Sequence, residues 1–105
     1  MAKRPGMAYQ IVYTQKARQT IAAVVDYVES QWSEKVASEF IFKLNRYINM
    51  LALGTLDGRV TAKKKDIKTI LITKHNRLYY RIKKDIIQII LLWDTRQNPA
   101  RNPYN

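Results

Sequence analysis

Residues 77–93 read RLYYRIKKDIIQIILLW, and this stretch decides the fold. Polar and apolar residues alternate over 77–83, which predicts a strand that places its apolar residues on one face. Residues 86–93 are apolar at nearly every position, which predicts an interior strand covered on both faces. Lys84 and Asp85 separate the two stretches, so we expect a hairpin.

The flanking segments extend this hairpin. A further strand is expected over 67–73, joined to it by a turn at residues 74–76. Upstream, apolar residues recur at steps of three and four and predict two amphipathic helices, over 16–31 and from Ser33 to Gly54. Ser33 is a candidate N-cap, and Gly54 is placed to end the second helix.

The first strand is expected over 8–14, which makes the order of elements β-α-α-β-β-β. This order predicts an α+β fold in which a helical hairpin packs on a mainly antiparallel four-stranded sheet. We expect residues 1–7 to form a flexible basic arm, 8–99 a single domain and 100–105 an irregular tail. A length of 105 residues fits one domain.

The composition restricts the classes of function. The chain has 19 Lys and Arg against 8 Asp and Glu, a net charge of +11, which indicates a polyanionic or acidic partner. Of these residues, 12 basic and 4 acidic lie in 57–105. The chain has no cysteine and one histidine, so we expect no metal site and no cofactor. The longest apolar run covers 89–93, and we therefore expect a cytoplasmic protein without a membrane partner.

The polar face of the strand over 77–83 is the leading candidate for contact with nucleic acid. It carries Arg77, Tyr79, Arg81 and Lys83. Arginine binds phosphate through two parallel hydrogen bonds, and tyrosine stacks on bases. Lys68 and Lys74 share one parity on the preceding strand and would add a second row of cations. The alternative is a solvated sheet face without a ligand.

Other polar residues give weaker signals. Lys63, Lys64 and Lys65 form a basic run that either solubilises a loop or attracts a polyanion. Histidine is the usual general base, and His75 is the only one. Asp94 is expected to form a local salt bridge with Arg96 rather than to act as an acid. Cations, tyrosine and one histidine would suit phosphodiester cleavage.

The predicted helices carry more aromatic side chains than one core needs. They are Tyr27, Trp32, Phe42 and Tyr47. We expect some of them to form an exposed patch for an apolar segment of a partner.

Four segments together resemble the RelE/ParE toxins of bacterial type II toxin–antitoxin systems. They are YQIVYT at 9–14, WSEKVA at 32–37, ITKHNRLYYRI at 72–82 and LLWDTRQNP at 91–99. The resemblance covers the chain after Met7 and implies a small basic toxin of the same fold. It also implies a cognate antitoxin that covers the toxin surface in a hetero-oligomer.

The resemblance implies two activities. RelE-like members cleave mRNA on the ribosome without a metal, and ParE-like members poison DNA gyrase. Arg77 and Arg96 match arginines that contact the scissile phosphate, and Lys68 matches a strand lysine. The companion lysine position is Ile70, and the catalytic tyrosine position is Asn102. The expected function is mRNA cleavage; the alternatives are gyrase inhibition and a degenerate toxin that only binds its antitoxin.

Overall fold

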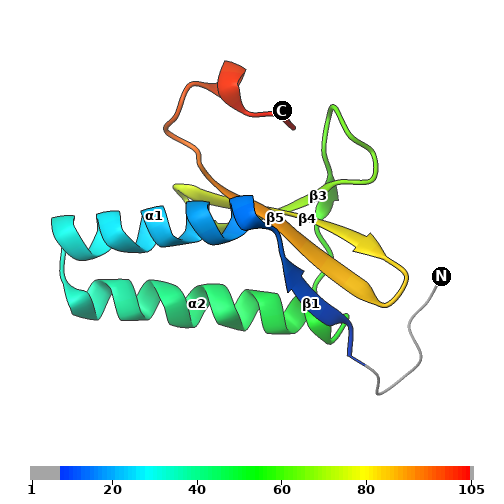
Figure 1. The fold of residues 1–105 in the computed structure, drawn as a ribbon, viewed down its shortest axis with the longest axis horizontal. Helices are drawn as coiled ribbons and strands as arrows, with labels where there is room; N and C mark the ends of the chain where they lie inside the picture. The colour runs from blue at the N-terminus through cyan, green and yellow to red at the C-terminus, as the bar shows by residue number, and fades with distance from the viewer. Residues whose placement is uncertain (1–7, 105) are drawn as a thin grey trace.

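The computed structural model describes residues 8–104, so the basic arm predicted over 1–7 lies outside the described residues. Two antiparallel helices share a core with one face of a sheet (Figure 1). The elements are β1 (Gln10–Tyr13), α1 (Gln15–Gln31), α2 (Glu34–Ala52), β2 (Arg59–Val60), β3 (Lys68–Thr73), β4 (Asn76–Lys83), β5 (Ile86–Asp94) and the short 3-10 helix η1 (Pro99–Arg101).

The sheet has five strands in the order β1-β5-β4-β3-β2. β1 is parallel to β5, and the other neighbours are antiparallel. The α+β class and the helical hairpin on a mainly antiparallel sheet are confirmed. The predicted number of four strands becomes five, because β2 has only two residues and shows no alternation that a sequence pattern could reveal.

Hydroxyl groups begin both helices. Thr14 Oγ1 accepts a hydrogen bond from the Ala17 N–H at 2.9 Å, and Ser33 Oγ accepts one from the Val36 N–H at 3.1 Å. The predicted N-cap at Ser33 is confirmed. Gly54 follows the end of α2 with a φ of 75°, a conformation that glycine adopts without strain.

An extra residue in β5 explains why this strand is apolar at both parities. The register between β4 and β5 shifts at Ile90, which has no partner on β4. Ile89 and Leu92 therefore both join the core under the helices, whereas Ile90 and Leu91 pack on the other face. β5 lies between β1 and β4, so the prediction of an interior strand is confirmed.

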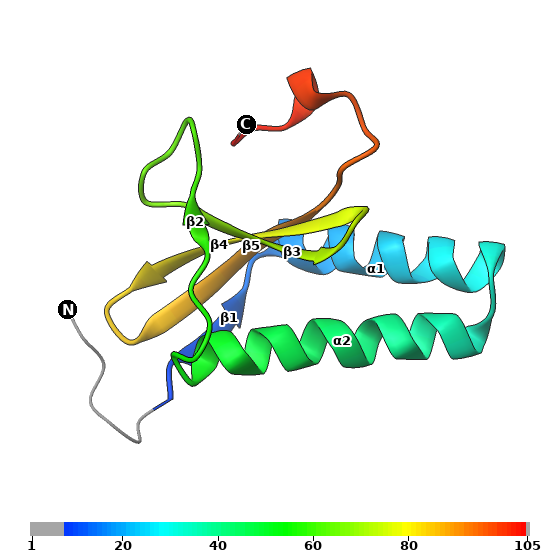
Figure 2. The same cartoon turned by 180° about the vertical axis from the view of Figure 1, so that it is seen from behind.

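The C-terminal segment covers part of the sheet face that points away from the helices. It turns back over the sheet after β5 (Figures 1 and 2). The Asn102 side-chain amide donates to the Tyr79 hydroxyl at 2.8 Å, and the rings of Tyr79 and Tyr104 lie 5.2 Å apart. Tyr79 is consequently 3% exposed. This burial corrects the prediction that Tyr79 stacks on a nucleic-acid base.

Gly58 allows the chain before β2 to approach the core closely. Its N–H donates to the Tyr80 hydroxyl at 2.7 Å, and a Cβ at this position would lie 2.6 Å from the Thr69 carbonyl oxygen. We expect Gly58→Ala to lower the free energy of unfolding by about 1–3 kcal/mol, because backbone must move to admit the methyl group. Urea unfolding measures this change. A midpoint equal to that of the unchanged chain would contradict the close contact.

Candidate functional site

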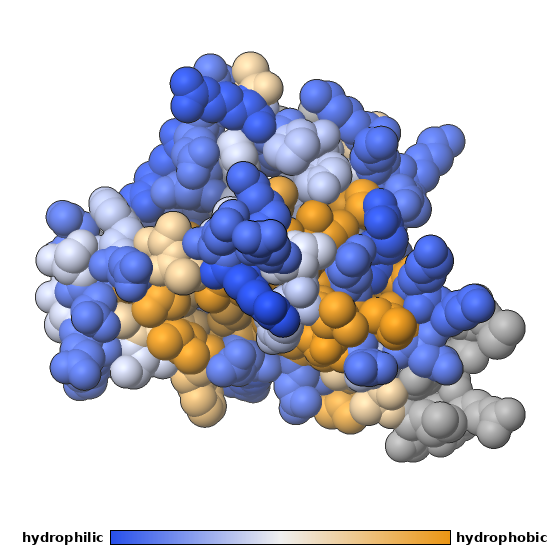
Figure 3. Space-filling model, in the orientation of Figure 1, coloured by the Kyte–Doolittle hydropathy of each residue, from blue (hydrophilic) through white to orange (hydrophobic). Residues whose placement is uncertain are grey.

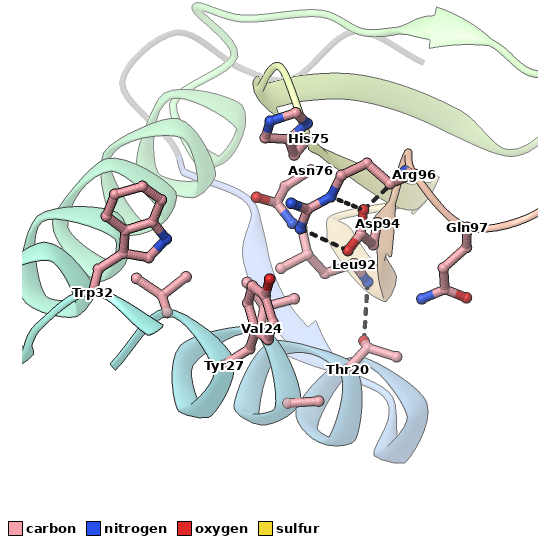
Figure 4. A pocket seen from close by; sticks show the side chains of 12 residues that line it. Thr20, Val24, Tyr27, Trp32, His75, Asn76, Leu92, Asp94, Arg96 and Gln97 are labelled. Atoms are coloured by element: carbon pink, nitrogen blue, oxygen red, sulfur yellow. Dashed lines mark hydrogen bonds and ion pairs between the residues drawn. The ribbon is translucent and has the colours of Figure 1, made fainter. Parts of the chain in front are cut away.

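A hollow of about 350 Å³ opens between α1 and the C-terminal end of β5, and we call it the α1–β5 hollow (Figure 4). Its polar and aromatic lining consists mainly of Tyr27, Trp32, His75, Asp94, Arg96 and Gln97. These side chains come from α1, from its C-terminal end, from the β3–β4 turn, from the last residue of β5 and from the segment that follows it. The hollow therefore collects groups from segments far apart in the sequence.

Two threonines, Thr14 at the start of α1 and Thr20 within it, hold α1 at a fixed distance from β5. The Thr20 hydroxyl accepts from the Leu92 N–H at 3.0 Å, and the Thr14 hydroxyl donates to the Ile90 carbonyl at 2.7 Å. The extra residue in β5 leaves these backbone groups without a complete strand ladder. Side-chain hydroxyls thus supply hydrogen-bond partners for backbone groups of β5 and connect this strand to α1.

Arg96 is held in one orientation at the hollow. Its Nε and Nη2 donate to the two Asp94 carboxylate oxygens at 3.0 and 2.9 Å, and its backbone N–H donates to Oδ1 at 2.9 Å. The guanidinium carbon also lies 5.6 Å from the centre of the Tyr27 ring. The predicted salt bridge is confirmed, and it places a pre-oriented cation beside an aromatic ring.

The Asp94–Arg96 pair should make stability depend on pH in the acid range. Hydrogen bonds from Arg96 hold the pKa of the Asp94 carboxyl below its usual value. The folded state therefore favours the carboxylate. The full stabilisation by the pair is present at pH values above the ordinary pKa of a carboxyl group. This stabilisation is lost as the pH falls through the lowered pKa.

We accordingly expect Asp94→Asn to lower the urea midpoint of unfolding at pH 7. The difference from the unchanged chain should shrink as the pH falls below the ordinary carboxyl range and through the lowered pKa of Asp94, because the side chain then loses the charge that Arg96 binds. Unfolding curves at pH 7, 4 and 3 measure this effect. A difference that stays constant over this range would show that the carboxylate charge is not responsible.

The four predicted catalytic residues lie in three places. His75 and Arg96 line the α1–β5 hollow. Arg77 pairs across β4–β5 with Trp93 and lines a different hollow on the face away from the helices. Lys68 lies beside the helix-facing core, with its Nζ 2.6 Å from Asp57. The structure brings together only the first two.

The other predicted cations are spread over the surface. Lys63, Lys64 and Lys65 are exposed on the β2–β3 loop, and Lys74 and Lys83 are exposed at the ends of strands. The Arg81 Nε lies 3.0 Å from an Asp66 carboxylate oxygen, so an acidic neighbour partly offsets its charge. The basic residues form a broad field rather than one focused site.

Three of the four aromatic residues predicted to form a patch are exposed. Trp32, Phe42 and Tyr27 have exposed fractions of 73%, 71% and 48%. Tyr47 is half-buried and packs against the core, which corrects its assignment to an exposed patch. Trp32 and Tyr27 line the α1–β5 hollow, whereas Phe42 is outside its lining.

An apolar groove runs between the two helices and has a volume of about 480 Å³. Ile21, Val25, Ile41 and Leu44 contribute most of its apolar walls. The surface over the helices shows hydrophobic residues among hydrophilic ones (Figure 3). A groove of this kind suits the apolar face of an amphipathic segment.

Sequence reasoning missed that Tyr27 and Trp32 meet Arg96 and His75 in one hollow. Asn76 and Gln97 complete its polar rim and were not singled out. Within residues 8–104, no group of three or more acidic or histidine side chains is placed to hold a metal ion. In that same part of the chain, no helix has the length and hydropathy to cross a membrane.

A family model described as "ParE toxin of type II toxin-antitoxin system, parDE" matches residues 11–99. A search against curated protein sequences finds no match. Among solved structures, the chromosomal ParDE toxin–antitoxin system from P. aeruginosa contains a chain of similar fold. The TM-score is 0.71 at 17% identity, and the match covers 83% of this chain and 96% of that one.

Two further solved structures share the fold. The E. coli DinJ-YafQ toxin–antitoxin complex matches with a TM-score of 0.58 at 12% identity, over 84% of this chain and 93% of that chain. The YoeB dimer from Staphylococcus aureus matches with a TM-score of 0.55 at 16% identity, over 82% of this chain and 95% of that chain.

Proposed function

Since the chain belongs to the ParE toxin family of type II toxin–antitoxin systems, it is a toxin with a cognate antitoxin, and we propose that it stops growth by binding DNA gyrase without cleaving RNA. Gyrase is the target that the resemblance to ParE-like members implies. The α1–β5 hollow is the surface that we assign to this binding.

The observation that carries the proposal is that Arg77 and Arg96 line different hollows. A nuclease of the kind implied by the resemblance needs both arginines on one phosphate, aligned to within a few tenths of an ångström. Here Arg77 lines a hollow on the face away from the helices, and Arg96 lines the α1–β5 hollow. The guanidinium of Arg96 also donates two hydrogen bonds to Asp94, so these two donors are not free to bind a phosphate. This arrangement favours recognition over catalysis.

The residue types around the α1–β5 hollow support protein binding. Tryptophan, tyrosine and arginine dominate the energetics of protein–protein interfaces, and here Trp32, Tyr27 and Arg96 line one hollow. Arg96 is already oriented by Asp94, so its contacts with a partner would cost little conformational entropy. We expect the antitoxin to cover Tyr27 and Trp32 and thereby block the target.

A second candidate is the ribosome-dependent cleavage of mRNA. His75 and Arg96 line the same hollow, which therefore contains a candidate general base and a cation that can bind phosphate. In this mechanism His75 would accept the proton of the RNA 2′-hydroxyl as its oxygen attacks the phosphate, and Arg96 would stabilise the charge on the phosphate. The 5′-oxygen of the next nucleotide would leave and take a proton from water. The reaction would then use neither Arg77 nor Lys68.

Induction of the toxin in cells distinguishes the two candidates. Under our proposal, primer extension after induction shows unchanged mRNA ends while chromosomal DNA breaks accumulate. The matched control for His75→Ala is Lys74→Ala, which changes the neighbouring exposed residue outside the hollow. New cuts in translated codons that disappear with His75→Ala would contradict the proposal and establish the second candidate.

A further inference from the structure

A second polar hollow, which we call the β2–β4 hollow, lies on the sheet face away from the helices. Its volume is about 310 Å³, and Arg59, Thr69, Arg77 and Tyr104 line it. Arg59 pairs across the sheet with Thr69, and their side chains therefore leave the same face. The tail that carries Tyr104 lies on the same side of the sheet as the β2–β3 loop (Figures 1 and 2).

Three polar groups of this hollow lack a partner among residues 8–104. Neither Arg59 nor Arg77 forms an ion pair with a described residue. Thr69 is only 8% exposed, and its hydroxyl is shielded from solvent without a hydrogen-bond partner. A buried hydroxyl without a partner is unfavourable, so an unsatisfied donor beside two guanidinium groups suggests a ligand oxygen that is absent from the free chain.

Carboxylates offset the charge of some other cations among residues 8–104. Lys68 pairs with Asp57, Arg81 with Asp66 and Arg96 with Asp94. Arg59 and Arg77 line the same hollow from β2 and β4, on either side of β3, and neither has a carboxylate partner among residues 8–104. Two guanidinium groups and one hydroxyl form a set of donors that matches an oxyanion.

We propose that the β2–β4 hollow binds the side-chain carboxylate of an acidic residue of the antitoxin. The inference rests on the family membership and not on gyrase as the target. A carboxylate at the end of a flexible stem can enter a hollow of this size, which Arg59, Arg77 and Thr69 line. The phosphate of a nucleic acid is flanked by sugars on both sides, which keeps it at the rim.

Thr69→Val gives this proposal a distinctive signature. Valine keeps the shape of the side chain and removes the unpaired hydroxyl, so the free toxin should become more stable and its Tm should rise by about 4 °C. The same change removes a donor to the ligand and should weaken binding. A residue with a purely structural role would not move stability and binding in opposite directions.

The first test is a titration of the full ¹⁵N-labelled chain followed by NMR. The probes are N-acetyl-glutamic acid α-amide, its glutamine counterpart and dimethyl phosphate. We expect saturable shifts of the Arg59, Thr69 and Arg77 amides with the glutamate probe alone, with a midpoint of about 1–10 mM. Equal shifts with the glutamine probe would overturn the proposal. Tighter binding of dimethyl phosphate would overturn it in favour of a nucleic-acid backbone.

The second test uses the antitoxin itself. Arg59→Gln and Thr69→Val are each expected to reduce its affinity about 10-fold, the effect of one charge-assisted or buried hydrogen bond. The control is Arg101→Gln, which removes the same charge from an exposed residue outside the hollow. Unchanged affinity for both variants, or a loss as large for the control, would overturn the proposal. Neither test depends on whether the target is gyrase.

Discussion

Replacing Trp32 with alanine should abolish growth arrest while the chain remains folded. Trp32 is 73% exposed and lines the α1–β5 hollow, so its ring contributes little to the core. Truncation of a tryptophan at the centre of an interface costs about 2–4 kcal/mol of binding, which corresponds to about 30- to 1,000-fold in affinity. The measurement is growth after induction, with the Tm and the soluble amount of each variant recorded in parallel.

Phe42 provides the matched control for this prediction. It is 71% exposed, also aromatic and outside the lining of the α1–β5 hollow. Phe42→Ala should therefore leave growth arrest intact under our proposal. If the two variants behave alike, either both toxic or both harmless, the hollow is not the surface that binds the target.

The largest expected loss of stability follows from Tyr80→Ala. Tyr80 has no exposed surface, its ring lies in the core under the helices and its hydroxyl accepts from the Gly58 N–H. Removal of a buried aromatic ring costs about 3–5 kcal/mol. Small domains have only about 5–15 kcal/mol of total stability, so the variant should lose a large share of it and unfold at a much lower urea concentration.

Two substitutions separate the contributions of Tyr80. Tyr80→Phe keeps the ring and should cost about 1–2 kcal/mol, because the Gly58 N–H loses its acceptor. Tyr27→Ala removes an exposed tyrosine and should change stability by less than about 0.5 kcal/mol. Urea unfolding measures all three variants. Equal losses for Tyr80→Phe and Tyr80→Ala would show that the hydrogen bond, and not the ring, holds this part of the core.

Local patterns in the sequence predicted both helices and four of the five strands of the described chain. Alternation over 77–83 identified β4, and the spacing of apolar residues identified both helices. The Ser33 cap and the Asp94–Arg96 salt bridge also follow from neighbouring residues. These features depend on contacts within a few positions along the chain, which the pattern of one segment records.

Features that depend on register were not predictable in this way. Lys68 shares its parity with Lys74, and the two were expected to add a second row of cations to the sheet. In the sheet Lys68 pairs with Tyr80, whose ring points into the core under the helices. Register decides the face on which a side chain lies, and a single sequence does not fix the register between two strands.

Contacts between segments that lie far apart in the sequence also could not be predicted from the sequence. The hydrogen bond from Asn102 to Tyr79 spans 23 positions, and nothing in the tail sequence predicts it. The α1–β5 hollow likewise joins Trp32 to Arg96 across most of the chain. The path of the chain after β5 determines both contacts, and only the folded structure reveals this path.

The most direct test of the central claim is a supercoiling assay with purified DNA gyrase and the purified toxin. The account predicts that the unchanged toxin and Phe42→Ala inhibit supercoiling and leave cleaved DNA, whereas Trp32→Ala does neither. A toxin that leaves gyrase fully active while ribosome-bound mRNA is cut would contradict the account.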